Sequence, residues 1–342
     1  MHNLTLVIPG LLGPDAHFSD DYIPALPALE TLLSRARHTK SNFSSYHRTL
    51  SDLMGFDSEP EKDVPVAAIT RAIDNDSDTH GRWLRADPVH LSPDRDGLIL
   101  MDSFVLSLSQ HDALAIADEV NKVLVEYGWT VEVPFEDRWY IRINDELDIT
   151  TTELASVVGC DIAGYLPQGK DSARFHSLLN ELQMQLHAAD INQLREKNGE
   201  LPINSVWFWG LGKIGVVPDP IWSAIFSDDI FTQSVAQMTS TNYYPVPQHL
   251  LGIQEKCGEK DDVLVVLPQC LSPTQYQNLQ LWNKALLLLE GSWFEPAMNW
   301  LQQGKLNNLR IISDAHDFQL NRFAMKKFWR KSIAIGQYRN KP

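Results

Sequence analysis

Apolar residues form short continuous runs at several points along the chain. The first run, Leu4 to Ile8, is ended by Pro9-Gly10. A run of this length, with little polar alternation, is typical of a strand buried on both faces of a parallel sheet. Comparable strand-like segments lie at 204–209, 263–267 and 309–312. We therefore expect these four segments to be strands of one core sheet.

Other segments carry apolar residues at helical spacing. Pro24 to Arg37 has Pro27 near its start, which suits the first turn of a helix, and residues 64–73 have a similar pattern. Ser109 opens a capping box before a strongly amphipathic stretch that Gly128 ends. A further helix is predicted from Ser172 to Ala188. A strand followed directly by a helix indicates an α/β fold.

The middle of the chain has a different pattern. Residues 129–133 and 139–143 alternate apolar and polar side chains around a Pro-Phe-Glu-Asp turn, which predicts a β-hairpin. With the two strong helices beside it, this hairpin would form a small α+β unit. We therefore predict a discontinuous core domain, residues 1–103 and 204–342, and an inserted α+β domain, residues 104–203.

Composition supports a globular protein of two domains. The chain has 342 residues, 44% of them hydrophobic, with ten Trp and thirteen Phe. Its net charge of −15 disfavours nonspecific binding to nucleic acid or to an anionic membrane, so we expect neither as a partner. The basic run from Lys326 to Lys341 is the exception. A solvated terminus and an anion-binding segment are both open interpretations of it.

The cysteines and the N-terminus indicate the compartment. Cys160, Cys257 and Cys270 are widely spaced and form no CxxC pair, so the pattern predicts neither a disulfide framework nor a zinc site. The first residues lack a basic region and a cleavage site of small residues. We expect a cytoplasmic protein.

The segment from Leu178 to Gly212 supports a more specific interpretation. It closely resembles a pattern of the archaeal-type cofactor-independent phosphoglycerate mutases, in which a helix leads to Asn-x-x-Arg, then Gly-Leu-Pro-x-Asn and a strand ending in glycines. The matching residues are Asn192, Arg195, Gly199, Leu201, Pro202 and Asn204, with Glu200 as an extra residue. The early helix 24–37, the turn 50–57 and Thr241-Asn-Tyr243 resemble further motifs of this family in the same order.

Two stretches, RADPVHLSPDRDGL and NSVWFWGLG, resemble a bacterial branch of this family, the RpfE-type regulatory proteins. The resemblance implies an alkaline-phosphatase-like core of three layers, α/β/α, with an inserted α+β domain. It also implies that active relatives hold two divalent metals and a serine that carries the phosphoryl group.

The residues that this chemistry needs are only partly present. Active relatives have Asp-Gly after the first strand, where this chain has Pro9-Gly10, and Ala-Pro-Asp-Glu-x-x-His where it has 267–273, LPQCLSP. Ser45 is the candidate nucleophile, from the loop 44–46. Asp314 and His316 are the candidate metal ligands, because they match the last Asp-His of the family. The core sheet should bring Pro9, this loop, Pro268 and Asp314 together at the carboxyl ends of its strands.

A second group of residues is predicted to bind an anionic ligand. In the family, arginines from this neighbourhood and from the insertion hold the phosphate and carboxylate of the substrate. The residues are Arg85, Asp87, His90, Arg95 and Arg195. A guanidinium fork suits such anions. The alternative is structural: Arg85 pairs with Asp87 to fix a loop, and a neutral His90 caps a strand.

Three functions remain open at this point. The first is a catalytically degenerate, regulatory relative of the mutases that binds a small phosphorylated or carboxylate ligand, or a protein partner. The second is an active phosphoglycerate mutase or phosphatase whose missing ligands come from elsewhere in the chain. The third is a protein-interaction scaffold. We expect no cofactor under the first reading, and Mn or Zn if the protein is active.

Overall fold

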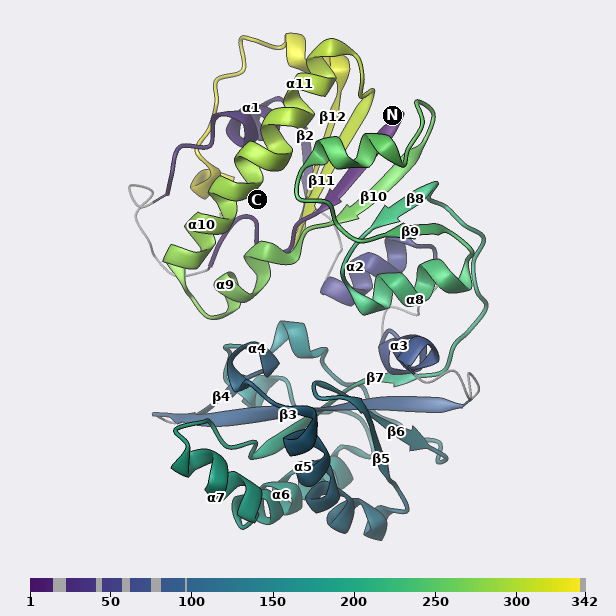
Figure 1. The fold of residues 1–342 in the computed structure, drawn as a ribbon, viewed down its shortest axis with the longest axis vertical. Coiled ribbons are helices and arrows are strands. Elements are labelled where there is room, and N and C mark those ends of the chain that lie inside the picture. The colour runs from purple at the N-terminus through teal and green to yellow at the C-terminus, as the bar shows by residue number, and fades with distance from the viewer. Residues whose placement is uncertain (15–22, 41–44, 57–61, 75–80, 96, 339–342) are drawn as a thin grey trace. The chain divides into compact units, whose positions relative to one another are not determined.

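The computed structural model describes residues 1–14, 23–40, 45–56, 62–74, 81–95 and 97–338 (Figure 1). The chain divides into two compact units. The first unit is discontinuous and contains Met1–Leu50 and Pro218–Pro342, and the second contains Ser51–Val217. Among the described segments, no helix has the length and apolar character needed to span a bilayer.

The first unit is built on a seven-stranded sheet in the order β2-β12-β11-β1-β10-β8-β9. Strand β1 lies between β10 and β11 and is parallel to both, whereas β12 is antiparallel to β11 and to β2. The strands are β1 (Asn3–Val7), β2 (Arg37–Lys40), β8 (Ala224–Phe226), β9 (Asn242–Tyr244), β10 (Asp262–Val266), β11 (Asn308–Ser313) and β12 (His316–Asn321). The predicted buried parallel strands 4–8, 263–267 and 309–312 are confirmed.

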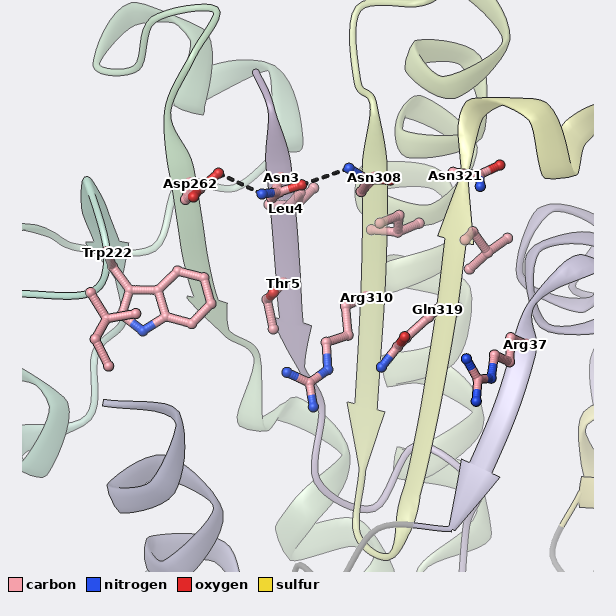
Figure 2. Close-up of a pocket in the computed structure, with 13 residues that line it drawn as sticks. Asn3, Leu4, Thr5, Arg37, Trp222, Asp262, Asn308, Arg310, Gln319 and Asn321 are labelled. Carbon is pink, nitrogen blue, oxygen red and sulfur yellow. Dashed lines mark hydrogen bonds between the residues drawn. The ribbon is translucent and has the colours of Figure 1, made fainter. Parts of the chain in front are cut away.

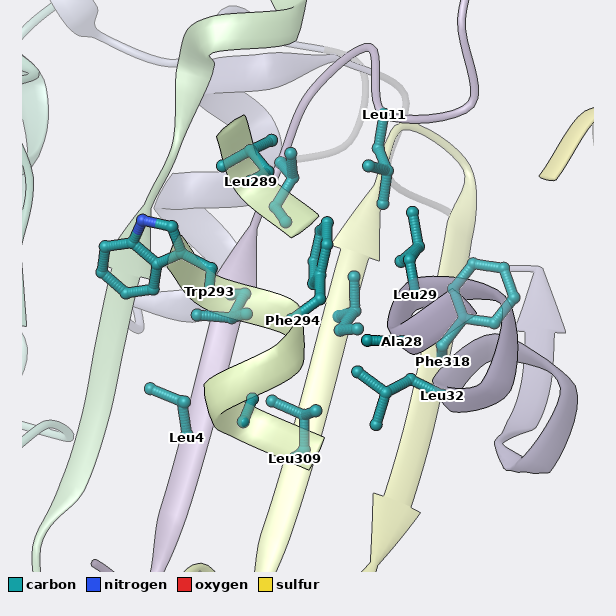
Figure 3. Packing of buried hydrophobic residues seen from close by; sticks show 14 of the residues in the cluster. Leu4, Leu11, Ala28, Leu29, Leu32, Leu289, Trp293, Phe294, Leu309 and Phe318 are labelled. Atoms are coloured by element: carbon teal, nitrogen blue, oxygen red, sulfur yellow. The ribbon is translucent and has the colours of Figure 1, made fainter. Parts of the chain in front are cut away.

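Helices cover one face of this sheet and form the core shown in Figure 3. Leu4, Leu309 and Phe318 from the strands pack with Leu29 and Trp293 from the helical layer. The helices of this unit are α1 (Pro27–Arg35), α8 (Ile230–Met238), α9 (Leu271–Gln275), α10 (Leu279–Leu289) and α11 (Glu295–Gln303), and a π-helical turn (Glu290–Phe294) joins the last two. Helix α2 (Tyr46–Leu53) crosses the boundary between the units.

The start of α1 is fixed by a residue from the far end of the sequence. Leu26, at the N-cap, offers no side-chain cap. The carboxylate of Glu290 instead accepts hydrogen bonds from the backbone N–H groups of Ala28 (2.6 Å) and Leu29 (3.0 Å). A negative charge at this position satisfies two unpaired donors and opposes the positive end of the helix dipole.

The second unit is built on a five-stranded antiparallel sheet in which β3 is the longest strand. Strand β3 pairs with β6, β4 and β7 along its length. The strands are β3 (Arg82–Asp94), β4 (Gly97–Met101), β5 (Val131–Phe135), β6 (Arg138–Ile143) and β7 (Ser205–Gly212). The predicted hairpin is confirmed as β5 and β6.

Side chains of β3 alternate between two environments. Leu84 and Ala86 join the larger core with α5 and α6, whereas Trp83 joins Ala67 and Ala68 of α3 in a smaller cluster. Arg85 and Asp87 follow Trp83 on the α3 face because the side-chain period of a strand is two. The helices of this unit are α3 (Val66–Asp74), α4 (Ser103–Leu106), α5 (Gln110–Leu124), α6 (Ser172–His187) and α7 (Asp190–Lys197).

The two compact units meet after residues 50 and 217, whereas the sequence analysis predicted domain boundaries after residues 103 and 203. The sequence placed residues 82–101 in the core domain, but they form β3 and β4 of the second sheet. It also placed the strand 204–209 in the core sheet, but this strand is β7 and pairs with β3 in the second sheet. The local residue pattern does not show which sheet β3 belongs to. Strand β3 pairs with β6 and β7, which lie far along the sequence, and a local pattern does not encode such distant pairing. The predicted α/β class is confirmed.

Candidate functional site

Three segments meet at the carboxyl ends of β1, β10 and β11. The backbone N–H of Gly10 donates to both carboxylate oxygens of Asp314, at 3.3 and 3.2 Å. Leu11 N–H donates to the hydroxyl of Ser313 (3.2 Å), and this hydroxyl donates to Asp314 Oδ2 (2.9 Å). The turn after β1 is therefore tied to the end of β11.

Gly10 also brings the segment after β10 into this edge. Its φ of +73° lies in the left-handed region, and a Cβ there would come within 2.7 Å of the Cys270 carbonyl oxygen. The Gly10 carbonyl accepts from Trp282 Nε1 (2.9 Å) and Thr274 Oγ1 (3.1 Å). Only glycine fits this position without displacing its neighbours.

The predicted meeting of strand ends is observed for three of its four members. The turn Pro9-Gly10, the 3₁₀ turn Pro268–Cys270 and Asp314 lie together, as the hydrogen bonds of Gly10 and its close approach to Cys270 show. Ser44 of the fourth member lies outside the described residues. Ser45 is described, and its carbonyl accepts the first hydrogen bond of α2, from Thr49 N–H at 3.0 Å. Its role as a nucleophile stays a prediction.

The described side chains at this edge do not make up the donor set of a two-metal site. Asp314 already accepts hydrogen bonds from Gly10 and Ser313. Burial, helped by the charge of Asp314, raises the pKa of the Cys270 thiol to about 12, so this side chain is a neutral thiol near pH 7. Among the described residues, no three His, Cys, Asp or Glu side chains are grouped so that they could hold a metal ion.

The second predicted metal ligand, His316, belongs to an aromatic stack. Its Nδ1 lies 2.9 Å from Nε2 of His38, and the two rings are nearly parallel at a centroid distance of 5.1 Å. The ring of Phe318 is nearly parallel to both histidine rings, at centroid distances of 4.6 Å from His38 and 6.2 Å from His316. Burial, with smaller effects of His38 and Lys40, lowers the pKa of His316. One of these two ring nitrogens therefore donates the hydrogen bond and the other accepts it.

Arg85 and Asp87 form a buried ion pair in the second unit. Arg85 Nε donates to Asp87 Oδ1 at 2.9 Å, and Asp87 also accepts from the backbone N–H of Trp139 (3.1 Å) and from Nε1 of Trp209 (2.7 Å). The guanidinium lies over the rings of Tyr140 and Trp209, at 5.1 and 5.2 Å. Each group of the pair is thus surrounded by partners of the same unit.

The electrostatics of this pair follow from its burial. Desolvation alone would lower the pKa of Arg85, but the adjacent carboxylate of Asp87 outweighs it and raises the pKa above its ordinary value. Burial disfavours the charged form of the Asp87 carboxyl and thereby raises its pKa. We regard the pair as ionised, because three hydrogen bonds and a further ion-pair contact of Arg85 reach the carboxylate, and arginine does not lose its proton in proteins.

His90 lies further along β3, and Arg95 follows the end of that strand. Neither residue joins this pair. His90 is buried, and its Nδ1–H donates to the Pro202 carbonyl at 2.8 Å. Arg95 is exposed in the turn between β3 and β4, with a positive φ of 43°. The contacts of His90 correspond to the strand-capping alternative of the sequence analysis.

Arg195 is also held by its own unit. It is buried and donates to the carbonyls of Leu201 (3.0 Å) and Leu106 (2.6 Å) and to the carboxylate of Asp112 (2.9 Å). Asn192 similarly donates to the Ile203 carbonyl (2.8 Å) and accepts from its N–H (2.8 Å). The motif that carries the family resemblance therefore fixes the path from α7 into β7. The ligand-binding roles of Arg85, Asp87, His90, Arg95 and Arg195 stay predictions.

A cavity of about 510 Å³ lies on a face of the seven-stranded sheet, and we call it the sheet-face pocket (Figure 2). Polar side chains from adjacent strands line it, among them Arg37, Arg310 and Gln319, and Trp222 stands at its side. Sequence reasoning missed this pocket. The sequence feature that indicates it is the presence of Thr5 and Arg310 inside otherwise apolar strands. Polar side chains at such positions mark a sheet face that apolar side chains do not cover.

The buried pair generates a stability prediction. Asp87→Ala should lower the free energy of unfolding by about 3–5 kcal/mol, because it leaves the Arg85 guanidinium buried without a counter-charge. Replacing both residues, Arg85→Met with Asp87→Leu, should recover most of this loss. Urea unfolding measures both effects. The control is Asp148→Ala, which breaks an exposed pair with Lys170 and should change stability little. Equal unfolding midpoints for Asp87→Ala and the control would contradict a structural role.

The histidine stack generates a pH prediction. Because the pKa of His316 is lower in the folded chain than its ordinary value of 6.5, the unfolded chain binds more protons between these two pKa values. His316 should therefore add stability that is complete above about pH 6.5 and is lost as the pH falls below it. The change in melting temperature from about pH 7 to pH 5 should be smaller in His316→Gln than in the wild type. The exposed residue His111→Gln is the control. A steeper pH dependence in His316→Gln would refute the lowered pKa.

Comparisons with known proteins agree with the motifs, although no protein-family profile matches the chain. A probable 2,3-bisphosphoglycerate-independent phosphoglycerate mutase of Geobacter sulfurreducens is 26% identical over 131 residues, which are 38% of this chain and 33% of that protein. A 2,3-bisphosphoglycerate-independent phosphoglycerate mutase of Methanosarcina mazei is 38% identical over 56 residues, 16% of this chain and 14% of that protein. The matched segments thus span a third or less of these relatives.

Solved structures resemble the chain over most of its length. The PH0037 protein from Pyrococcus horikoshii matches with a TM-score of 0.52 and 11% identity, covering 94% of this chain and 87% of that protein. A cofactor-independent phosphoglycerate mutase from Thermoplasma acidophilum covers 98% of this chain and 95% of that one, with a TM-score of 0.49 and 15% identity. At 11% identity, the likeness to PH0037 is one of fold alone. The sequence matches relate this chain to the cofactor-independent phosphoglycerate mutases, as its motifs predicted.

Proposed function

We propose that this protein is a catalytically degenerate relative of the cofactor-independent phosphoglycerate mutases, which binds a small anionic ligand rather than turning it over. The observation that carries this proposal is the closed carboxyl edge of β1, β10 and β11. There, Asp314 accepts hydrogen bonds from Gly10 N–H and Ser313, and the adjacent thiol of Cys270 is neutral. Among the described residues, the side chains that remain at this edge do not group as a metal-binding set.

Transfer of a phosphoryl group makes demands that this edge does not meet. The nucleophilic hydroxyl must be activated, and the phosphoryl oxygens must be neutralised by cations in fixed positions. Groups that act as a unit in catalysis cannot be removed singly without losing most of the rate enhancement. Pro9, Gln269 and Cys270 stand where the family motifs have carboxylates, and none of these side chains carries a charge.

The sheet-face pocket supports the binding half of the proposal. Arg37 is exposed there, and Arg310, although paired with Asp317 at 2.9 Å, keeps about a third of its side chain exposed (33%). The amide groups of Asn3, Asn308 and Gln319 line the same surface, together with the carboxylate of Asp262. Each amide already donates one hydrogen bond, to Asp262, Asn3 and Asp317 respectively, and has a second N–H for a ligand oxygen. Two guanidinium groups beside such donors suit a carboxylate or a phosphate.

One alternative function is an active metal-dependent mutase or phosphatase, and the partial homology to mutases favours it. A regulatory role, as the resemblance to the RpfE-type branch suggests, is compatible with ligand binding and is part of our proposal. A protein-interaction scaffold would need no ligand at all. Activity and binding assays separate these three possibilities.

The activity prediction is that the purified protein does not interconvert 2- and 3-phosphoglycerate above background, with or without added manganese, and releases no phosphate from either. Ser45→Ala and His316→Ala should leave any trace activity unchanged. Metal content is measured on the same preparation. A turnover of about one per second that Ser45→Ala abolishes would show that the enzyme is active.

The binding prediction concerns Arg37. Inorganic phosphate and 3-phosphoglycerate should bind the wild type in calorimetric titrations, and Arg37→Ala should weaken this binding by about tenfold, the effect of losing one charged hydrogen bond. Arg95→Ala is the matched control, because Arg95 is an exposed arginine of the other unit. If Arg95→Ala weakens binding and Arg37→Ala does not, the ligand binds at the residues predicted from the sequence.

A further inference from the structure

The segment Arg322–Lys331, here called the basic-aromatic segment, differs from the rest of the surface in charge. It carries five cations, Arg322, Lys326, Lys327, Arg330 and Lys331. The chain as a whole has a net charge of −15, yet it contains no Asp or Glu after Asp317. Charges are screened over about 8 Å at physiological ionic strength, so a surface that approaches this segment meets a positive potential.

Three large aromatic side chains are exposed among these cations. Phe323 is 58% exposed, Phe328 81% and Trp329 67%. The guanidinium of Arg322 lies 4.9 Å from the ring of Phe323, so cations and aromatic rings share one surface. Exposing one large apolar side chain is ordinary, but three within seven residues form a patch that indicates an interaction surface.

The segment is anchored at the end of α1. Arg35 Nη1 donates to the Met325 carbonyl at 2.7 Å, and Arg330 Nη1 donates to the Ala36 carbonyl at 3.0 Å. Asn321 caps the 3₁₀ turn Arg322–Lys326 by accepting from Ala324 N–H at 3.0 Å. Ala324 and Met325 are buried in the core, which leaves the aromatic side chains on either side of them at the surface. The patch is therefore part of the folded unit.

We propose that the basic-aromatic segment docks the first unit onto a membrane surface that contains anionic phospholipids. Lysine and arginine are attracted to the headgroups, and Trp and Phe side chains insert at the boundary between headgroups and acyl chains. Such binding requires protruding aromatic side chains but no shaped pocket. Binding of this kind is peripheral to the bilayer.

The geometry favours a membrane over the other polyanionic partner, single-stranded nucleic acid. Proteins that bind single strands stack successive bases on the faces of aromatic rings. Here the rings of Phe328 and Trp329 lie 5.4 Å apart and nearly perpendicular, with an angle of 80°. One ring thus packs its edge against the other, and the pair offers no parallel platform for adjacent bases. Insertion into a lipid interface does not depend on the angle between the rings.

The test is co-sedimentation of the full chain with vesicles of phosphatidylcholine that contain phosphatidylglycerol, compared with vesicles of phosphatidylcholine alone. We expect binding to the anionic vesicles only, and a decrease of this binding as salt is raised. Phe328→Ser with Trp329→Ser should weaken it by at least about tenfold, because each buried aromatic side chain contributes apolar area. Lys326→Gln with Lys327→Gln should weaken it by about tenfold or more.

Matched variants make the result specific. Phe104→Ser removes an aromatic side chain of the second unit with the same 58% exposure as Phe323, and it should not change binding. Circular dichroism checks that each variant is folded, and if the aromatic variant is not, the lysine variant decides. The proposal is overturned if anionic vesicles do not bind the wild type, or if Phe328→Ser with Trp329→Ser binds them as well as the wild type. Binding of a single-stranded oligonucleotide in place of vesicles would also overturn it.

Discussion

The first unit depends on one constraint, which is that the central strand β1 must be paired on both edges. Its residues Asn3 to Val7 pair with β10 on one side and with β11 on the other, so that Val7 lies opposite both Val266 and Ile312. Unpaired backbone groups in a buried strand would cost about as much as lost hydrogen bonds. The constraint therefore joins the first residues of the chain to residues beyond 260, and it explains why this unit is discontinuous.

The same pairing decides what stands at the carboxyl edge. Once β1, β10 and β11 are in register, Gly10, Cys270 and Asp314 have to lie together, whatever their side chains are. In this chain, residues at this edge form hydrogen bonds with one another. Asp314 accepts the hydrogen bond of Gly10 N–H, and the Cys270 thiol is buried and neutral. The edge has thereby become a packed and hydrogen-bonded part of the fold.

In the second unit, too, the buried polar residues hydrogen-bond to groups of the same unit. Arg195 and Asn192 come from the motif that carries the resemblance, and their side chains donate to the backbone carbonyls of Leu201 and Ile203. Arg85 and Asp87 are likewise enclosed with Tyr140 and Trp209. The two features that we propose as binding surfaces, the sheet-face pocket and the basic-aromatic segment, both lie in the first unit.

Local residue patterns were enough to predict the helices and strands, the α/β class and the resemblance to the cofactor-independent phosphoglycerate mutases. Continuous apolar runs marked β1, β10 and β11, and helical periodicity marked α1, α5 and α6, because both signals depend on neighbours a few residues apart. Only the tertiary structure decided that β3 belongs to the second sheet, that Arg85 and Arg195 are enclosed, and that Arg37 and Arg310 share a pocket. Those outcomes depend on pairing and burial between segments far apart in the chain, and no local pattern of residues encodes which distant strand or carbonyl a side chain will meet.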